Sequence, residues 1–320
     1  MSSASDPEIR RADSSDVPAI LETLKAALGE TPILRRTRRL WEWKHVMNPF
    51  GASLVLVAEA SGRIAGVRAL MQWQLVQPDG TLVRCMRAVD TATHPDFARQ
   101  GIFRRLTMRA VDEARELGIE LIFNTPNDMS APGYLKMGWS EVARIGVLAR
   151  PRLGEAASVP DGSVPTVASL GPSLTKALPR AGIPDREPLG LRTPRSPEYL
   201  AWRFTRHPTA QYGWLGSLDH GWLVARASTR KSRSELVLSD LLGSPKPALV
   251  RRLAREHRAR YMAGWFSPGS PERGIAIRGG MLPVPGLRAL RLVALPLADI
   301  GLDVSNLGSW DLATSDLELL

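Results

Sequence analysis

The chain has 320 residues, of which 44% are hydrophobic and 23% are charged, a composition typical of a globular protein with room for two domain-sized cores. It contains no apolar run near the ~20 residues that a membrane-spanning helix needs, and its first ten residues lack the basic and apolar regions of a signal peptide. Cys85 is the only cysteine and cannot form an internal disulfide, so we expect a cytoplasmic protein.

The net charge of +10 is compatible with a nucleic-acid ligand or with a phosphorylated cofactor. Arginines gather at 35–39 and 251–260, but in the second group Val250, Leu253 and Ala254 mark the opposite side of a helix. That pattern predicts a solvated helix face, not the basic clusters interleaved with aromatic residues that nucleic-acid binding requires. Nucleic-acid binding is therefore the less favoured interpretation.

The first 93 residues predict two helices and three strands from their apolar spacing. The helices are expected at 13–28 and 40–47, and the strands at 53–60, 63–73 and 82–93. Ser61-Gly62 is a hairpin signal between the first two strands, and Pro78-Asp79-Gly80 predicts a tight turn before the third.

The next segment predicts a phosphate-binding loop between a strand and a helix. Arg99, Gln100 and Gly101 precede a helix expected at 102–117, which ends at Gly118. Arg104 and Arg105 lie in its first turn, where positive charge opposes the helix dipole unless an anion also docks on the free N–H groups. A strand at 119–124 follows, which makes a right-handed β-α-β crossover with parallel strands.

The segment from Arg87 to Trp139 resembles the GNAT superfamily of acyl-CoA-dependent N-acetyltransferases. That family's pyrophosphate loop has the pattern [Q/R]-x-x-G-x-[G/A]; Gly101 supplies the central glycine, but Ala98 and Phe103 depart from the first and last positions. A second family element, N-x-x-[A/S]-x-x-x-Y-x-x-x-G-[F/W], is matched at every spacing by Asn127, Ser130, Tyr134, Gly138 and Trp139.

The resemblance implies acetyl-CoA as co-substrate and a direct acyl transfer to a primary amine. Tyr134 is then the general acid that protonates the leaving thiolate, and Asn127 binds the pantetheine arm or orders the loop. The structural alternative for Asn127 is an Asx-turn after Pro126. The residues expected to bind the cofactor are Thr93, Arg99, Gln100, Gly101, Ile102, Phe103, Arg104, Asn127 and Ser130.

The general base is less defined, because a carboxylate, a histidine or an ordered water could take the proton from the amine. Asp90 lies on the strand beside the expected gap and is our choice as the second catalytic residue, with Asp128 and His94 as alternatives. No spacing of His, Cys or acidic residues predicts a metal site.

The second half of the chain repeats weak features of the first in the same order. Trp43/Trp202, Gly62/Gly221, Pro95/Pro245 and Gly138/Gly280 are the paired positions. We therefore expect domains at 1–150 and 165–320 joined by a Pro/Gly/Ala/Ser-rich linker at 151–164, with a last strand of the first domain near 142–149. The second copy has no glycine at the position of Gly101 and should have lost the cofactor site.

The expected fold is α/β, with tandem GNAT-like domains that are each a mixed, mostly antiparallel sheet flanked by helices, with a central parallel β-α-β cofactor cleft. The acceptor is a small-molecule or peptide amine that the sequence does not identify. Two alternatives stay open: a non-catalytic binding protein of the same fold with CoA as effector, and a basic nucleic-acid-binding module.

Overall fold

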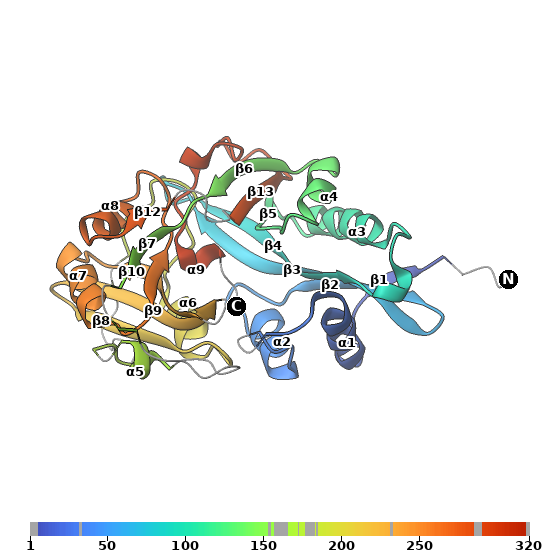
Figure 1. Ribbon diagram of the computed structural model, residues 1–320. Helices are drawn as coiled ribbons and strands as arrows, with labels where there is room; N and C mark the ends of the chain where they lie inside the picture. Colours follow the sequence, from blue (N-terminus) through green and yellow to red (C-terminus); the bar gives the residue numbers. More distant parts are fainter. Residues whose placement is uncertain are drawn as a thin grey trace. The chain divides into compact units, whose positions relative to one another are not determined.

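The computed structural model describes residues 6–31, 34–152, 155–156, 166–171, 173–176, 183, 185–230, 233–284 and 290–317. The chain divides into two compact units (Figure 1). The first unit contains 1–75, 82–141 and 292–305, and the second contains 76–81, 142–291 and 306–320. Neither unit is continuous in sequence, and residues 153–154 and 157–164 of the predicted linker lie outside the described residues.

The first unit is built on a seven-stranded mixed sheet. Its order is β1 (Glu8–Arg11), β2 (Leu54–Ala60), β3 (Arg63–Val76), β4 (Leu82–Thr93), β5 (Leu121–Asn124), β13 (Leu290–Pro296) and β6 (Ser140–Ile145). Neighbours pair antiparallel at β1/β2, β2/β3 and β5/β13, whereas β4 and β5 are parallel, as predicted. Ser61 and Gly62 both have positive φ, 52° and 72°, which confirms the predicted hairpin turn between β2 and β3.

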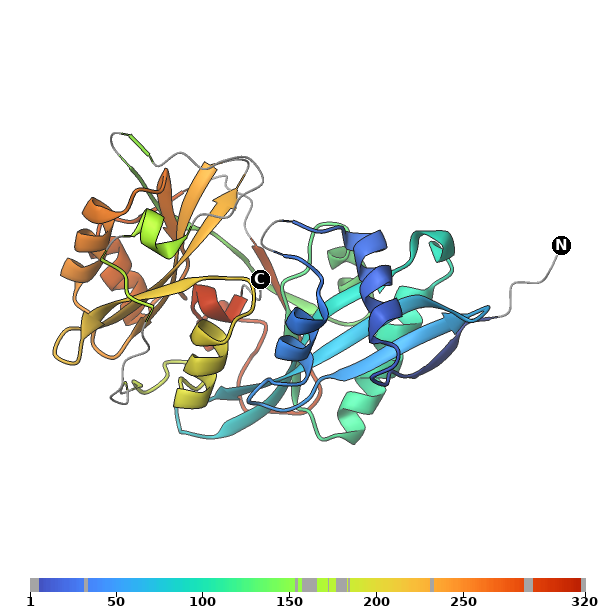
Figure 2. The ribbon, with the colours of Figure 1, turned by 90° about the horizontal axis from the view of Figure 1, so that it is seen from below.

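Helices cover both faces of this sheet. Helices α1 (Val17–Leu28) and α2 (Arg38–His45) lie on one face, and α3 (Ile102–Glu116) and α4 (Ala131–Lys136) on the other (Figures 1 and 2). The apolar positions of α3, namely Ile102, Leu106, Ala110 and Ala114, are all buried, as their helical spacing requires. Two separate apolar cores result, one on each side of the sheet.

The second unit is built on a six-stranded mixed sheet. Its order is β12 (Leu282–Pro283), β7 (Leu148–Pro151), β11 (Tyr261–Gly264), β10 (Arg233–Leu242), β9 (Gly221–Arg230) and β8 (Tyr212–Ser217). Its helices are α5 (Val167–Leu170), α6 (Pro197–Leu200), α7 (Pro247–Glu256), α8 (Pro271–Arg278) and α9 (Thr314–Leu317). Arg251, Arg252 and Arg255 of α7 are exposed opposite the buried Val250 and Leu253, as expected of a solvated face.

The two sheets have the same sequence of strand directions. Strands β8, β9 and β10 are antiparallel neighbours and β10 pairs parallel with β11, which is the arrangement of β2, β3, β4 and β5. The strand that follows comes from elsewhere in the chain in both sheets. It is β13 beside β5 in the first sheet and β7 beside β11 in the second.

This arrangement corrects one predicted element. The single closing strand expected near 142–149 is two strands, because β6 ends at Ile145 in the first sheet and β7 begins at Leu148 in the second. The chain therefore passes between the sheets at Gly146 and Val147, and β13 returns to complete the first. Apolar alternation predicts a strand here but carries no information on which sheet the strand joins.

Candidate active site

Strands β4 and β5 pair over a short stretch of the first unit, from Cys85/Leu121 to Arg87/Phe123, although β4 continues to Thr93. Beyond this stretch β5 ends at Asn124, and the backbone of Asp90 on β4 has φ 41°, a left-handed value that is uncommon outside glycine. The divergence of the two strands stays a prediction. Thr93 ends β4 and is half-buried.

The loop before α3 forms an uncapped helix N-terminus. Gly101 is the N-cap residue with φ 72° and offers no side-chain cap, so the first N–H groups of α3 lack an intrahelical acceptor. A side chain added at Gly101 would meet no atom within 4 Å, which leaves the space in front of these groups open. An anion placed there would face the positive end of the helix dipole.

Three polar side chains surround this N-terminus. Arg99, Gln100 and Arg104 are exposed, and none of them forms an ion pair with another described residue. Arg105 differs, because it binds Asp6 and the carbonyl oxygen of Pro7. Arg99, Gln100 and Arg104 are therefore free to bind a ligand, whereas Arg105 anchors the chain before β1.

The two apolar residues that open α3 have separate roles. Ile102 is buried against the sheet, so close to Gly66 that a side chain there would lie 2.6 Å from Ile102 Cγ2. Phe103 turns towards α4 and lies 2.8 Å from where a Cβ of Gly133 would stand. Its ring meets the ring of Tyr134 edge-on at 5.5 Å. The large side chain at the family's small position therefore occupies the gap between α3 and α4.

Tyr134 is buried beside the point at which β4 leaves β5. Its ring packs edge-on against Trp139 at 5.2 Å, and only 3% of the residue is exposed. Its hydroxyl oxygen accepts a hydrogen bond of 2.5 Å from Nη1 of Arg68, on β3. The same Nη1 donates to Oγ1 of Thr91, on β4, at 2.7 Å.

Asn127 and Ser130 form the turn that leads into α4. Oδ1 of Asn127 accepts hydrogen bonds from the N–H groups of Met129 at 3.1 Å and Ser130 at 2.9 Å, and from the Ser130 hydroxyl at 3.0 Å. This is the Asx-turn that the sequence left as one of two roles for Asn127. The turn fixes the start of the helix that carries Tyr134.

Asp90 lies in a cluster of basic side chains. Its carboxylate accepts hydrogen bonds from Lys44 Nζ at 2.8 Å, His45 Nε2 at 3.0 Å and Arg36 Nη1 at 3.4 Å. Burial opposes its charge, but the charge of Lys44 and the hydrogen bond of His45 hold the pKa of Asp90 well below its ordinary value.

This environment argues against Asp90 as a general base, because its oxygens are already taken and its proton affinity is low. Burial also lowers the pKa of His45, which favours its neutral ring, and the two cations Lys44 and Arg36 flank the single negative charge of Asp90. Asp128 is exposed, and His94 accepts from the Asp96 N–H at 3.3 Å. Neither of these two alternative bases forms a hydrogen bond with Tyr134.

Sequence reasoning missed Arg68, Arg36, Lys44 and His45. Arg68 did carry a signal, since it is the one charge in the apolar run Ala65–Met71. The basic partners of Asp90 carried none, because they lie about 45–54 residues away in sequence and only the tertiary fold unites them.

The second unit differs at each corresponding position. Helix α7 begins at Pro247 and has Lys246 as its N-cap residue, where α3 has Gly101. Asp240 on β10 forms an ion pair with Arg195 at 2.9 Å and accepts from Ser315 at 2.7 Å. Beyond β11, the C-terminal segment hydrogen-bonds to Trp265 and Ser267 through Thr314 and Leu312. The segment from Leu312 to Thr314 thus lies against the residues that follow β11.

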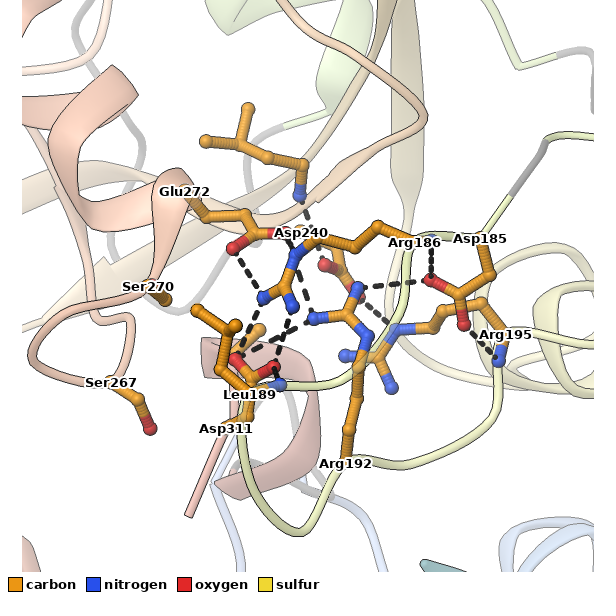
Figure 3. Close-up of polar contacts among 12 residues, drawn as sticks. Asp185, Arg186, Leu189, Arg192, Arg195, Asp240, Ser267, Ser270, Glu272 and Asp311 are labelled. Atoms are coloured by element: carbon orange, nitrogen blue, oxygen red, sulfur yellow. Dashed lines mark hydrogen bonds and ion pairs between the residues drawn. The ribbon is translucent and has the colours of Figure 1, made fainter. Parts of the chain in front are cut away.

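A second ionic cluster lies in the same unit. Figure 3 shows the guanidinium of Arg186 between the carboxylates of Glu272 and Asp311, with contacts of 2.7 and 2.6 Å. Arg192 contacts Asp185 at 3.2 Å. Every arginine of this cluster has a carboxylate partner, which indicates a structural role.

Comparison with known proteins supports a GNAT fold. Residues 8–142 match the family model described as acetyltransferase (GNAT) domain. A search of curated proteins finds no match. The segment at 8–142 is thus similar to GNAT acetyltransferase domains.

Solved structures resemble a larger part of the chain. Eis1 from Mycobacterium abscessus is 16% identical with a TM-score of 0.56, covering 90% of this chain and 72% of its own. A GCN5-related N-acetyltransferase from Anabaena variabilis ATCC 29413 is 14% identical with a TM-score of 0.59 and the same coverage. One from Kribbella flavida is 13% identical with a TM-score of 0.56, covering 91% and 72%. These identities show the fold alone.

Two further features concern membranes and metals. Among the described residues, no helix has the length and apolarity that a bilayer crossing demands. No group of three or more His, Cys, Asp or Glu side chains there could hold a metal ion.

Proposed function

We propose that the first unit is an acetyl-CoA-dependent N-acyltransferase that transfers its acyl group directly to a primary amine. The observation that carries this proposal is the uncapped N-terminus of α3 at Gly101, flanked by free Arg99, Gln100 and Arg104, within a GNAT domain. Backbone N–H groups and unpaired basic side chains at one open helix end suit a pyrophosphate.

The fit to the rest of the cofactor depends on Phe103. We propose that β4 and β5 diverge beyond their last pair and admit the pantetheine arm beside Thr93, with the turn of Asn127 and Ser130 bordering it. The ring of Phe103 lies between the cradle and Tyr134, so we propose that this ring rotates when the cofactor binds. Ile102 contributes its backbone N–H, because its side chain is buried in the core.

Tyr134 is proposed as the general acid. When bound, acetyl-CoA supplies a thioester whose sulfur leaves as the amine nitrogen bonds to the acyl carbon. The Tyr134 hydroxyl is the buried proton donor beside the cleft and gives its proton to that sulfur. An ammonium acceptor first loses one proton to solvent or to a base such as Asp128 or His94, and the proton that the acylated nitrogen then releases restores Tyr134. Asp90 holds Lys44 and His45 in place.

We further propose that the second unit is a copy of the same fold without a cofactor site. Its matching strand directions support duplication, and the Trp43/Trp202 and Gly62/Gly221 pairs fall on comparable buried and turn positions. Lys246 at the N-cap of α7, followed by Pro247, stands where α3 has Gly101 and supports the loss of the cradle. We take 1–150 and 165–320 as the ancestral copies, with β13 and β7 exchanged between their sheets.

Replacement of Gly101 by leucine tests the cradle. The side chain would cover the first N–H groups of α3, and the positive φ adds strain of about 1–2 kcal/mol. Gly101→Leu should abolish acetyl-CoA binding measured by calorimetry. Gly62→Leu is the matched control, because Gly62 also has φ 72° and open space but lies in the β2/β3 turn. Equal acetyl-CoA affinity in both folded variants would refute the site.

A second candidate function is a non-catalytic protein that binds CoA as an effector. Phe103 favours it, because its ring contacts Tyr134 where the family has a small residue. The two functions differ in turnover. A screen of small-molecule and peptide amines with acetyl-CoA, read as free thiol, should show release with at least one acceptor if the protein is an enzyme. Saturable binding without any release would favour the effector.

A further inference from the structure

Arg68 is a buried cation in the middle of β3. None of its surface is exposed, and it lies on the face of the sheet that carries α3 and α4. Its guanidinium carbon is 5.1 Å from the centre of the Tyr134 ring. One nitrogen, Nη1, donates both to the Tyr134 oxygen and to the Thr91 hydroxyl.

The rest of this guanidinium has no partner. Nε and Nη2 are buried without a hydrogen-bond acceptor, and no carboxylate of the described residues pairs with Arg68. A buried charge of this kind is costly unless it is compensated. Arg195 in the second unit shows the usual solution, because its side chain is equally buried but pairs with Asp240 at 2.9 Å and Asp316 at 2.8 Å.

The direction of the hydrogen bond shows what Arg68 can do. A guanidinium only donates, so the Tyr134 oxygen is the acceptor and its own proton points elsewhere. The hydroxyl is thereby left able to donate to a ligand. When it gives up its proton, the oxygen becomes negative beside a cation that had no counter-ion before.

We propose that Arg68 is the positioning residue of the acyl transfer, which orients the Tyr134 hydroxyl for donation and balances the negative charge that Tyr134 acquires. This inference rests on the proposed function. In the step concerned, the carbon–sulfur bond breaks, the proton of the Tyr134 hydroxyl passes to sulfur, and the phenolate oxygen keeps its hydrogen bond from Arg68 Nη1. The proton released by the acylated amine restores the phenol.

The hydrogen bond from Arg68 to Tyr134 is stronger once negative charge has developed on the Tyr134 oxygen than before. Its loss should therefore lower turnover and leave acetyl-CoA binding nearly unchanged. Arg68→Gln should lower kcat for thiol release by about 10–100-fold, with the KM for acetyl-CoA changed less than about twofold. Arg68→Lys should recover part of the loss, since it restores the charge but not the fork of donors.

A double-mutant cycle separates this role from a structural one. Tyr134→Phe should lower kcat by about 10²–10⁴-fold. If Arg68 acts through Tyr134, adding Arg68→Gln to Tyr134→Phe should cost no more than about twofold further. A merely structural Arg68 would lower the activity of both backgrounds by the same factor, and that result would overturn the proposal.

The second unit offers a matched control. Arg203 is also buried, donates from Nη1 to the Tyr212 hydroxyl at 2.5 Å and lies 5.3 Å from the centre of that ring. Arg203→Gln should leave kcat within about twofold of wild type. Thermal unfolding of each variant verifies that the enzyme measured is folded.

Failure of the Arg68 proposal and failure of the proposed function would give different results. If wild type is active and folded Arg68→Gln has the same kcat, the proposed role of Arg68 is wrong but the proposed function stands. Wild type that binds acetyl-CoA but releases no thiol with any amine would overturn the proposed function, and the role of Arg68 with it.

Discussion

Asp90 is a predicted catalytic residue whose contacts in the fold favour a structural role. It stands at the bend of β4 beside the site, but Lys44, His45 and Arg36 already hold its carboxylate. Removing one member of a buried ionic cluster leaves the others uncompensated. Asp90→Asn should therefore lower the free energy of unfolding by about 3–5 kcal/mol at pH 7, measured by urea denaturation.

The pH dependence of that loss follows from the direction of the shift. The folded carboxyl has a pKa well below the ~3.9 of an unfolded aspartate. Its contribution is thus complete above about pH 4 and declines as the pH falls below this value. The difference in the free energy of unfolding between wild type and Asp90→Asn should therefore become smaller as the pH falls below about 4. Asp128→Asn, at an exposed loop position, should change stability by less than about 0.5 kcal/mol at any pH.

At the scale of elements, we propose that the contact between α3 and α4 controls access to Tyr134. If the Phe103 ring must rotate before the cofactor binds, molecules in which the ring packs on Tyr134 cannot bind it. Their share of the population lowers the apparent affinity for acetyl-CoA. Phe103→Ala should then tighten acetyl-CoA binding by up to about tenfold and cost less than about 3 kcal/mol of stability. Calorimetric titration measures the first effect and thermal unfolding the second.

Phe50→Ala is the matched control for that prediction. Phe50 is a half-buried phenylalanine of the same unit that packs on Trp73 at 5.3 Å, away from α3 and α4. Its removal should cost stability without any gain in affinity. Weaker binding in Phe103→Ala than in Phe50→Ala would mean that the ring lines the cofactor site instead of closing it.

Local elements were readable from the sequence because their signals are local. The apolar spacing of α3, the Ser61-Gly62 turn and the parallel pair β4/β5 are all present in the structure. The position of Tyr134 was known only from motif spacing, and its contact with Arg68 depends on two residues 66 positions apart. Such a contact depends on the register between strands and helices, which apolar periodicity does not encode.

For the whole molecule, the predicted boundary near residue 150 did not anticipate the exchange of β7 and β13. Neither strand can be assigned to a sheet from its own sequence, because both alternate in the same way. In the structure Val293 of β13 pairs with Asn124 at the end of β5, and Leu148 of β7 pairs with Gly264 at the end of β11. The two residues are fully buried, each in the core of the unit it joins.

This exchange gives a reciprocal prediction. A charge at either position would be buried without a partner and should cost more than about 3 kcal/mol. Val293→Asp should remove the hydrogen-exchange protection of β5 and spare β11, whereas Leu148→Asp should do the opposite. If each domain instead closed its own sheet, Val293→Asp would expose β11 and leave β5 protected. The pattern of protection therefore decides whether β13 completes the sheet that carries the proposed acyltransferase site.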